Sequence, residues 1–132
     1  MIINHKYKFI FFKTRKTAGT SIEIALSQFC SKGDIITRIT NEDELKRRKL
    51  GFPGPQNYVT SLMHYKKADW INLIKKAQLK SFHNHSTAAF IKNSIPEEIW
   101  KSYYKFTFER NPFDKSISRY YWSTRSSDSP IS

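Results

Sequence analysis

Two short segments near the ends of the chain are strongly apolar. The first, residues 6–13, contains an unbroken apolar run from Phe9 to Phe12, as expected for a strand that is buried on both faces. The second, residues 104–109, places an aromatic residue at every second position, which also favours a strand. Each segment is followed by a polar loop and then by apolar residues at helical spacing. The pattern therefore predicts two strand–loop–helix units.

Helical spacing and capping residues predict further helices between these units and after them. Thr20 and Glu23 have the spacing of a capping box at the start of the first helix. Asn111 and Pro112 suit the first positions of the last helix. The other expected helices are a charged surface helix over residues 41–49, a helix capped by Asp69, one over residues 86–92, and one that begins with a capping box of Ser94 and Glu97.

This order of elements predicts an α/β fold in which helices flank a parallel sheet. A chain of 132 residues suits a single domain, 1–132. From Ser123 onward the sequence is polar, and we expect no further strand or core helix there. Ligands of parallel sheets bind at the carboxyl ends of the strands, and both polar loops, after Phe12 and after Phe108, are expected at that edge.

The composition narrows the class of protein. Apolar residues make up 39% and aromatic residues 15% of the chain, which is enough for a packed core. The net charge of +12 favours an anionic partner, and charge alone does not distinguish a nucleotide, a nucleic acid and an anionic glycan. No apolar run is long enough for a membrane span and no signal peptide is recognisable, so we expect a cytoplasmic protein. The single cysteine, Cys30, cannot form an internal disulfide, which suits a reducing compartment.

The loop after the first strand has the features of a phosphate-binding loop. It leads directly into a helix, whose first N–H groups are unpaired and attract anions. A glycine lets the backbone approach a ligand, while a lysine and hydroxyls add charge and donors. The spacing is not that of a Walker A loop, and no Mg²⁺-binding carboxylate follows the second strand, which argues against a kinase-like enzyme. The candidate ligand-binding residues are Arg15, Lys16, Thr17, Ala18, Gly19, Thr20 and Ser21.

Two further elements carry candidate chemistry. Arg110 follows the second strand, where its guanidinium can bind phosphate oxygens, and Ser118 comes two helical turns later. His83 and His85 precede a short helix, and a histidine can accept a proton from a hydroxyl group. These two histidines could also bind a metal ion, but no further Cys or His joins them at ligand spacing, so no metal site is expected.

Taken together, the three elements resemble one protein family. Residues 16–21, Lys-Thr-Ala-Gly-Thr-Ser, resemble the loop that holds the 5′-phosphosulfate of 3′-phosphoadenosine 5′-phosphosulfate (PAPS) in sulfotransferases. Residues 110–114 with Ser118 resemble the 3′-phosphate element of that family, and residues 82–85 resemble the histidine segment of its heparan sulfate 2-O-sulfotransferase branch. The chain is therefore similar to bacterial members of sulfotransferase family 2 from about Tyr7 to Trp122.

This resemblance implies a P-loop-NTPase-like three-layer sandwich and a specific set of roles. PAPS would be the co-substrate, without a metal, and the acceptor a hydroxyl group, in particular that of a carbohydrate. Lys16 would stabilise the leaving phosphate, and His85 would be the general base, with His83 as a second catalytic histidine. The implied 5′-phosphate contacts are Thr17, Gly19, Thr20 and Ser21, and the implied 3′-phosphate contacts are Arg110 and Ser118.

The chain also departs from the family pattern. Arg15 stands where the family usually has proline, and the family domain usually continues well past the helix that carries Ser118. We therefore expect this chain to be a poor enzyme as it stands.

One alternative is a nucleotide-binding remnant without turnover. Another is a basic nucleic-acid-binding module, which is disfavoured because the aromatic residues follow core patterns and no nucleic-acid motif is present. The sequence predicts neither the acceptor's identity nor the oligomeric state.

Overall fold

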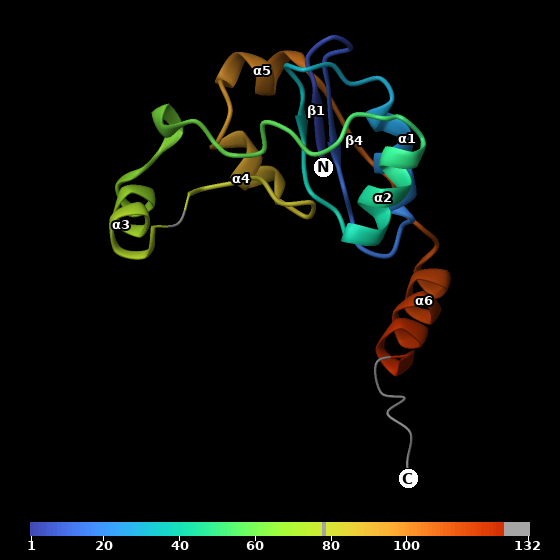
Figure 1. Ribbon diagram of the computed structural model, residues 1–132. Coiled ribbons are helices and arrows are strands. Elements are labelled where there is room, and N and C mark those ends of the chain that lie inside the picture. The colour runs from blue at the N-terminus through green and yellow to red at the C-terminus, as the bar shows by residue number, and fades with distance from the viewer. Residues whose placement is uncertain (78, 126–132) are drawn as a thin grey trace.

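The computed structural model describes residues 1–77 and 79–125, which form a mixed α/β fold (Figure 1). The strands are β1 (Ile2–Asn4), β2 (Phe9–Phe12), β3 (Ile35–Ile36) and β4 (Tyr104–Thr107). The helices are α1 (Gly19–Ser27), α2 (Asn41–Lys49), α3 (Lys67–Lys76), α4 (Ala88–Lys92), α5 (Glu97–Ser102) and α6 (Pro112–Arg125), with a short 3₁₀ helix at Leu62–His64. The expectation for the chain end lies outside the described residues from position 126 on.

The four strands form one sheet in the order β3-β1-β2-β4. The predicted parallel pairing is present between β2 and β4, where Phe12 is opposite Thr107. The rest of the sheet is antiparallel, because β1 pairs in that sense with both β2 and β3. The prediction of a parallel sheet is therefore correct only for the two strands that precede the polar loops. Residues 6–8, expected to be part of the first strand, instead belong to the turn of the β1–β2 hairpin, in which Lys8 has a φ of 52°.

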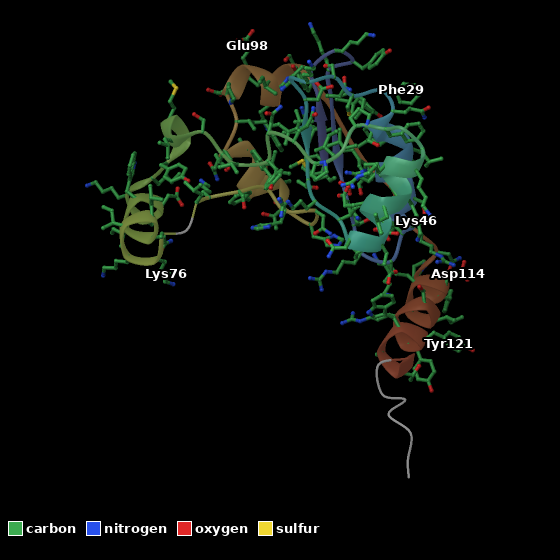
Figure 2. The ribbon with its side chains drawn as sticks, viewed as in Figure 1. Phe29, Lys46, Lys76, Glu98, Asp114 and Tyr121 are labelled. Carbon is green, nitrogen blue, oxygen red and sulfur yellow. The ribbon has the colours of Figure 1, made fainter. Side chains whose placement is uncertain are left out.

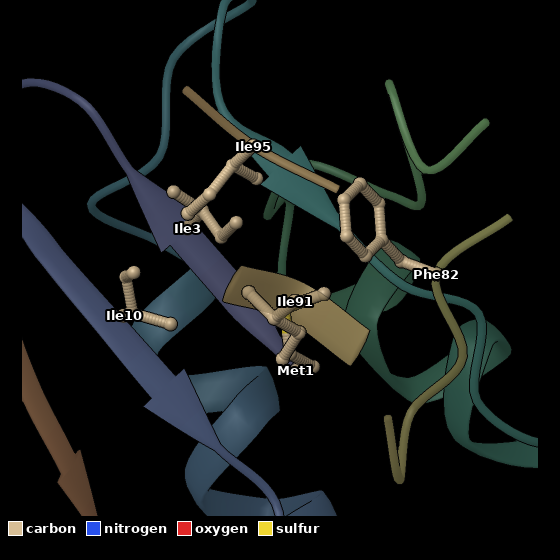
Figure 3. Packing of buried hydrophobic residues seen from close by; sticks show 6 residues of the cluster. All are labelled: Met1, Ile3, Ile10, Phe82, Ile91 and Ile95. Carbon is tan, nitrogen blue, oxygen red and sulfur yellow. The ribbon is translucent and has the colours of Figure 1, made fainter. Parts of the chain in front are cut away.

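Helices cover both faces of this sheet, as Figure 1 shows for α1 and α2 on one side and for α4 and α5 on the other. Side chains alternate along a strand, so neighbouring residues enter different cores. Ile3 and Ile10 pack with residues of the α4–α5 side, whereas Ile2 and Phe11 pack against α1. The buried residues of the first core, drawn in Figure 3, are Met1, Ile3, Ile10, Phe82, Ile91 and Ile95.

Two helices begin differently from what the capping patterns predict. The N-cap of α1 is Ala18, in the left-handed conformation, and no side chain caps this helix. Glu23 therefore does not close a capping box with Thr20. The N-cap of α5 is Pro96, again without a side-chain cap. Ser94, the other expected capping residue, is buried instead.

Other helix predictions agree with the structure more closely. The charged segment 41–49 forms α2 with the expected bounds. Asn111 accepts a hydrogen bond from the backbone N–H of Phe113 at the start of α6, as an N-cap does. Asp69 accepts one from the backbone N–H of Lys66, but it lies in the first turn of α3 rather than ahead of the helix.

Helix α6 extends away from the sheet, with Asp114 and Tyr121 on its surface (Figure 2). Its large apolar side chains are mostly exposed, among them Phe113 at 79% and Tyr121 at 67%. Within residues 1–77 and 79–125, no helix has the length and apolar character that crossing a membrane requires.

Cys30, just after α1, packs against the core that contains Ile2 and Phe11, and its reactivity provides a test of this packing. Its sulfur accepts a weak hydrogen bond from Asn4 at 3.6 Å, and burial raises the pKa of the thiol to about 11. Because only the thiolate reacts, we expect Cys30 in the folded chain to be alkylated by iodoacetamide at pH 8 roughly 100-fold more slowly than an unperturbed thiol. Mass spectrometry of quenched samples measures this rate. The control is the same chain in urea, and equal rates in both conditions would show that the thiol is not buried.

Candidate functional site

The two polar loops meet at one edge of the sheet, at the carboxyl ends of β2 and β4. Two threonine hydroxyls join them. Thr14 donates to the carbonyl oxygen of Phe108 at 2.7 Å, and Thr107 donates to the carbonyl oxygen of Phe12 at 2.8 Å. The sequence analysis missed both threonines, because a threonine at a strand end gives no signal that distinguishes it from an ordinary strand residue.

The backbone of the first loop turns sharply twice. Lys16 and Ala18 have positive φ angles of 63° and 56°, which non-glycine residues seldom adopt. Left-handed residues within a turn orient successive N–H groups toward one point, an arrangement that binds anions in many proteins. Thr17, between them, is buried, and its hydroxyl bonds to the Thr14 hydroxyl at 2.9 Å and to the Thr14 carbonyl oxygen at 3.1 Å. Its side chain thus holds the loop together.

Gly19, the first residue of α1, is required by close packing. A Cβ atom at this position would lie 2.8 Å from Cγ of Lys13 and 3.3 Å from the carbonyl oxygen of Thr14. The missing side chain allows the loop to fold back against the first turn of the helix. The unpaired N–H groups of that turn, with their partial positive charge, therefore lie next to the loop.

A buried ionic cluster holds the loop and α1 from behind. The Glu23 carboxylate, which has no exposed surface, lies 3.2 Å from the Lys13 ammonium, 3.6 Å from the Arg47 guanidinium and 3.1 Å from the Met1 amino group. Arg47, on α2, is also fully buried and lies 3.3 Å from Glu44. Burial lowers the pKa of the Met1 amino group to about 6, although Glu23 opposes the shift. The Lys13 ammonium is therefore held in the protein interior. The segment 41–49 was expected to be a surface helix, but the buried side chain of Arg47 shows that it also contributes to the interior.

Lys16, unlike Lys13, forms no ion pair within the described residues. Its ammonium group lies 4.0 Å from the centre of the Trp122 ring on α6, in a cation–π contact. Arg15 and Ser21 are exposed beside it, and Thr20 is half-buried. The cationic side of the loop thus faces outward, toward α6.

The histidines of the predicted site lie in different surroundings. His85 reaches the loop, where its Nδ1 is 3.0 Å from the carbonyl oxygen of Lys13. A carbonyl can only accept, so Nδ1 carries the proton and Nε2 of a neutral imidazole is left as a proton acceptor. His83 instead lines a polar hollow of about 190 Å³ together with Asp69, Asn72 and Lys80, and no residue of 13–21 lines that hollow.

Arg110 lies between β4 and α6, past the same edge of the sheet as the loop, and Ser118 lies on α6. The Arg110 guanidinium is exposed, and its Nε is 4.0 Å from Asp114 in the first turn of α6. Glu109 is paired with Lys115 at 2.7 Å, and this hydrogen bond holds the pKa of Glu109 below its usual range. Ser118 is half-buried on α6. Among the described residues, no group of three or more His, Cys, Asp or Glu side chains could hold a metal ion.

Comparison with known protein families assigns the chain to a family. The family model of sulfotransferase family 2, described as "Sulfotransferase family", matches residues 1–125. The chain therefore belongs to the sulfotransferase family. No curated protein and no solved structure matches the chain. Membership supports the transfer of a sulfuryl group to a hydroxyl acceptor as the general chemistry, and it agrees with the mixed α/β sheet flanked by helices.

Proposed function

We propose that this chain transfers the sulfuryl group of PAPS to a hydroxyl group of a carbohydrate, on a P-loop-like three-layer framework. The observation that carries the proposal is the contact between His85 and the carbonyl oxygen of Lys13 at 3.0 Å. It joins a candidate general base to a loop that has the form of an anion site. A sulfuryl transferase needs these two features next to each other.

The phosphate groups of PAPS are assigned to the two loops. The 5′-phosphosulfate would bind the N–H groups of the first loop and the start of α1, with the hydroxyls of Thr20 and Ser21 as further donors. Lys16 would leave Trp122 and stabilise the negative charge on the leaving phosphate oxygen. Arg110 and Ser118 would bind the 3′-phosphate from the β4 side.

His85 would act on the acceptor. Its Nε2 accepts the hydroxyl proton while the acceptor oxygen bonds to sulfur, and the bond between sulfur and the phosphate oxygen breaks. Adenosine 3′,5′-bisphosphate leaves with the electron pair of that bond. As in phosphoryl transfer, alignment and charge stabilisation supply most of the rate. The hydrogen bond at Nδ1 suits this role, because it fixes the ring and selects the tautomer in which Nε2 is the proton acceptor.

A carbohydrate acceptor is supported by the polar hollow that His83 lines. Its lining contains the amide of Asn72, the Asp69 carboxylate and the Lys80 ammonium, which pair with each other at 3.1 Å, and the aromatic ring of Phe90. Groups of this kind hydrogen-bond to sugar hydroxyls, and an aromatic ring stacks on the apolar face of a sugar. We assign His83 to acceptor binding, with a direct part in proton transfer as the less favoured role.

Nucleotide binding without turnover is the second candidate function. The observation that favours it is the exposure of the α6 side of the site, where the side chain of Arg110 is 47% exposed and Phe113 is 79% exposed. Water at a reacting centre weakens the electrostatic stabilisation on which sulfuryl transfer depends. Assaying the purified chain with radiolabelled PAPS and a panel of glycans decides between transfer and binding alone.

The assignment of two separate phosphate elements predicts a specific ligand preference. We expect adenosine 3′,5′-bisphosphate to raise the melting temperature of the chain, whereas AMP, which lacks the 3′-phosphate, does so far less. Linkage gives about 2.7 kcal/mol of stabilisation at a hundredfold excess over the dissociation constant. A thermal-shift titration with both nucleotides measures the difference. Equal shifts for the two would remove the 3′-phosphate role from Arg110 and Ser118.

A further inference from the structure

Helix α3 is turned the opposite way from an ordinary surface helix. Asp69 and Asn72, three positions apart, both line the polar hollow and so face the body of the protein, where Asp69 pairs with Lys80 at 3.1 Å. A surface helix normally turns its apolar side toward the core and its polar side toward water. In α3 this arrangement is reversed, and none of its residues is buried. At about 100° per residue, one stripe on the outward side, called here the α3 stripe, consists of Trp70, Ile71 and Ile74.

The α3 stripe is open to solvent. Ile74 is 81% exposed, and Trp70 and Ile71 are exposed as well. Met63, in the 3₁₀ helix that leads to α3, is 91% exposed. Figure 1 shows that α3 projects from the body of the protein, far from α1 and α2. Apolar surface gathered in this way indicates a docking surface for another molecule.

The charges around the α3 stripe are almost all positive. In residues 61–77 the one acidic side chain is Asp69, which already pairs with Lys80. Lys67, in the first turn, places positive charge where the helix macrodipole disfavours it, so helix stability does not account for this residue. The partner is therefore expected to be negatively charged. The lysines at the two ends of α3 are Lys66, Lys67, Lys75 and Lys76.

An anionic lipid surface has the chemistry that these features require. An amphipathic helix with lysines and an exposed tryptophan binds in the plane of the lipid headgroups, with its apolar side at the boundary of the acyl chains. Lysine stems follow the apolar region while their ammonium groups reach the phosphates. Because the stripe is convex, a protein partner would need a matching groove, whereas acyl chains adapt to its shape. A second copy of the chain is disfavoured as the partner, since it carries the same net charge of +12.

We propose that α3 docks this protein on anionic lipid bilayers. Trp70, Ile71 and Ile74 enter the boundary between headgroups and acyl chains, and the lysines at the ends of the helix bind lipid phosphates. The helix lies in the plane of the bilayer surface and does not cross it. The docking surface lies on the side of α3 that faces away from the polar hollow, so it does not depend on the proposed sulfuryl transfer.

Co-sedimentation of the full chain with lipid vesicles tests the proposal. We expect binding to vesicles of equal parts phosphatidylglycerol and phosphatidylcholine, and none to vesicles of phosphatidylcholine alone. The double variant Ile71→Gln with Ile74→Gln should bind about tenfold more weakly or worse, because it removes most of the apolar contact. The matched control is Leu45→Gln with Leu50→Gln, which changes two exposed apolar residues at α2 and should bind as the wild type does.

A second pair of variants separates docking through α3 from a general attraction of the basic chain. Lys67→Gln with Lys75→Gln should weaken binding about 25-fold, since each lysine near an anionic surface contributes about fivefold. Arg48→Gln with Lys49→Gln removes the same charge from α2 and should weaken binding far less. Equal losses in the two double variants would mean that the net charge alone attracts the chain, which would overturn the proposal.

Brominated phosphatidylglycerol locates the contact, because bromine at the acyl chains quenches only nearby tryptophans. We expect vesicles that contain it to quench the fluorescence of the wild type, and the quenching to disappear in Trp70→Phe. Quenching that persists in this variant would assign membrane contact to another part of the chain and overturn the role of α3. A chain that does not bind anionic vesicles at all would also overturn the proposal and leave α3 as a docking surface for an acidic protein.

Discussion

Replacing Glu23 by alanine is expected to lower the free energy of unfolding by about 3–5 kcal/mol, because it leaves buried cations without their carboxylate. Lys13 has no other ion pair within the described residues, and its side chain is 4% exposed. Arg47 would keep Glu44, but its Nε and Nη2 atoms have no hydrogen-bond partner among the described groups. Removing the charge that faces them therefore leaves a desolvation penalty with little to offset it.

Urea denaturation followed by circular dichroism measures this loss. Glu97→Ala is the matched control, since Glu97 pairs with Lys101 at 2.8 Å on the surface with its side chain 75% exposed. Exposed pairs contribute little, so the control should unfold at nearly the wild-type urea concentration. A Glu23→Ala variant as stable as this control would mean that packing, and not charge pairing, holds α1 against the sheet.

Replacing His85 by alanine is expected to reduce the rate of sulfuryl transfer by about 10²–10⁴-fold while the affinity for adenosine 3′,5′-bisphosphate stays within about twofold. The reason is that His85 acts on the acceptor proton, which the nucleotide does not contain. Arg110→Ala should have the opposite profile. It removes a charged contact to a phosphate that is present before the reaction, so the affinity for the bisphosphate falls strongly.

Calorimetry with the bisphosphate and transfer assays with labelled PAPS separate the two effects. His83→Ala is the informative control, because His83 lies in the polar hollow and not at the loop. We expect this variant to raise the acceptor KM more than it lowers kcat. If His85→Ala loses nucleotide affinity as severely as Arg110→Ala, the contact of His85 with Lys13 is structural and the base is another group.

Sequence patterns predicted the parts of the fold that are governed by local chemistry. Helix α2 has the expected bounds because its charges and its cap at Thr40 are close together in the chain. The strands β2 and β4 were recognised from their aromatic runs, and their parallel pairing brings the two predicted loops to one edge. The proximity of the two loops, which carry Lys16 and Arg110, was therefore accessible from the sequence, through the rule that ligands bind at the carboxyl ends of parallel strands.

Tertiary contacts determined what the patterns missed. Glu23 has the spacing of a capping residue, but the buried cations of Lys13 and Arg47 attract it more strongly than the helix N-terminus does. Strand β1 is three residues long, too short for a periodic signal, and its pairing with β2 depends on the turn between them. His83 and His85 are only two positions apart, so the sequence did not predict their different surroundings. The path of the backbone at residues 83–85 decides which of the two histidines reaches the loop.

The pairing of β2 with β4 also has a consequence for the order of folding. The β1–β2 hairpin and α1 are neighbours in the chain, whereas the hydrogen bond from Thr14 to Phe108 joins residues 94 positions apart. Closing so long a loop is entropically expensive and slow compared with forming local contacts. We therefore expect the first loop to form early on the hairpin, and Arg110 to arrive only when β4 docks. A ligand that contacts both loops would then hold β4 against β2. It would slow the release of β4 and protect the amides of this strand from hydrogen exchange.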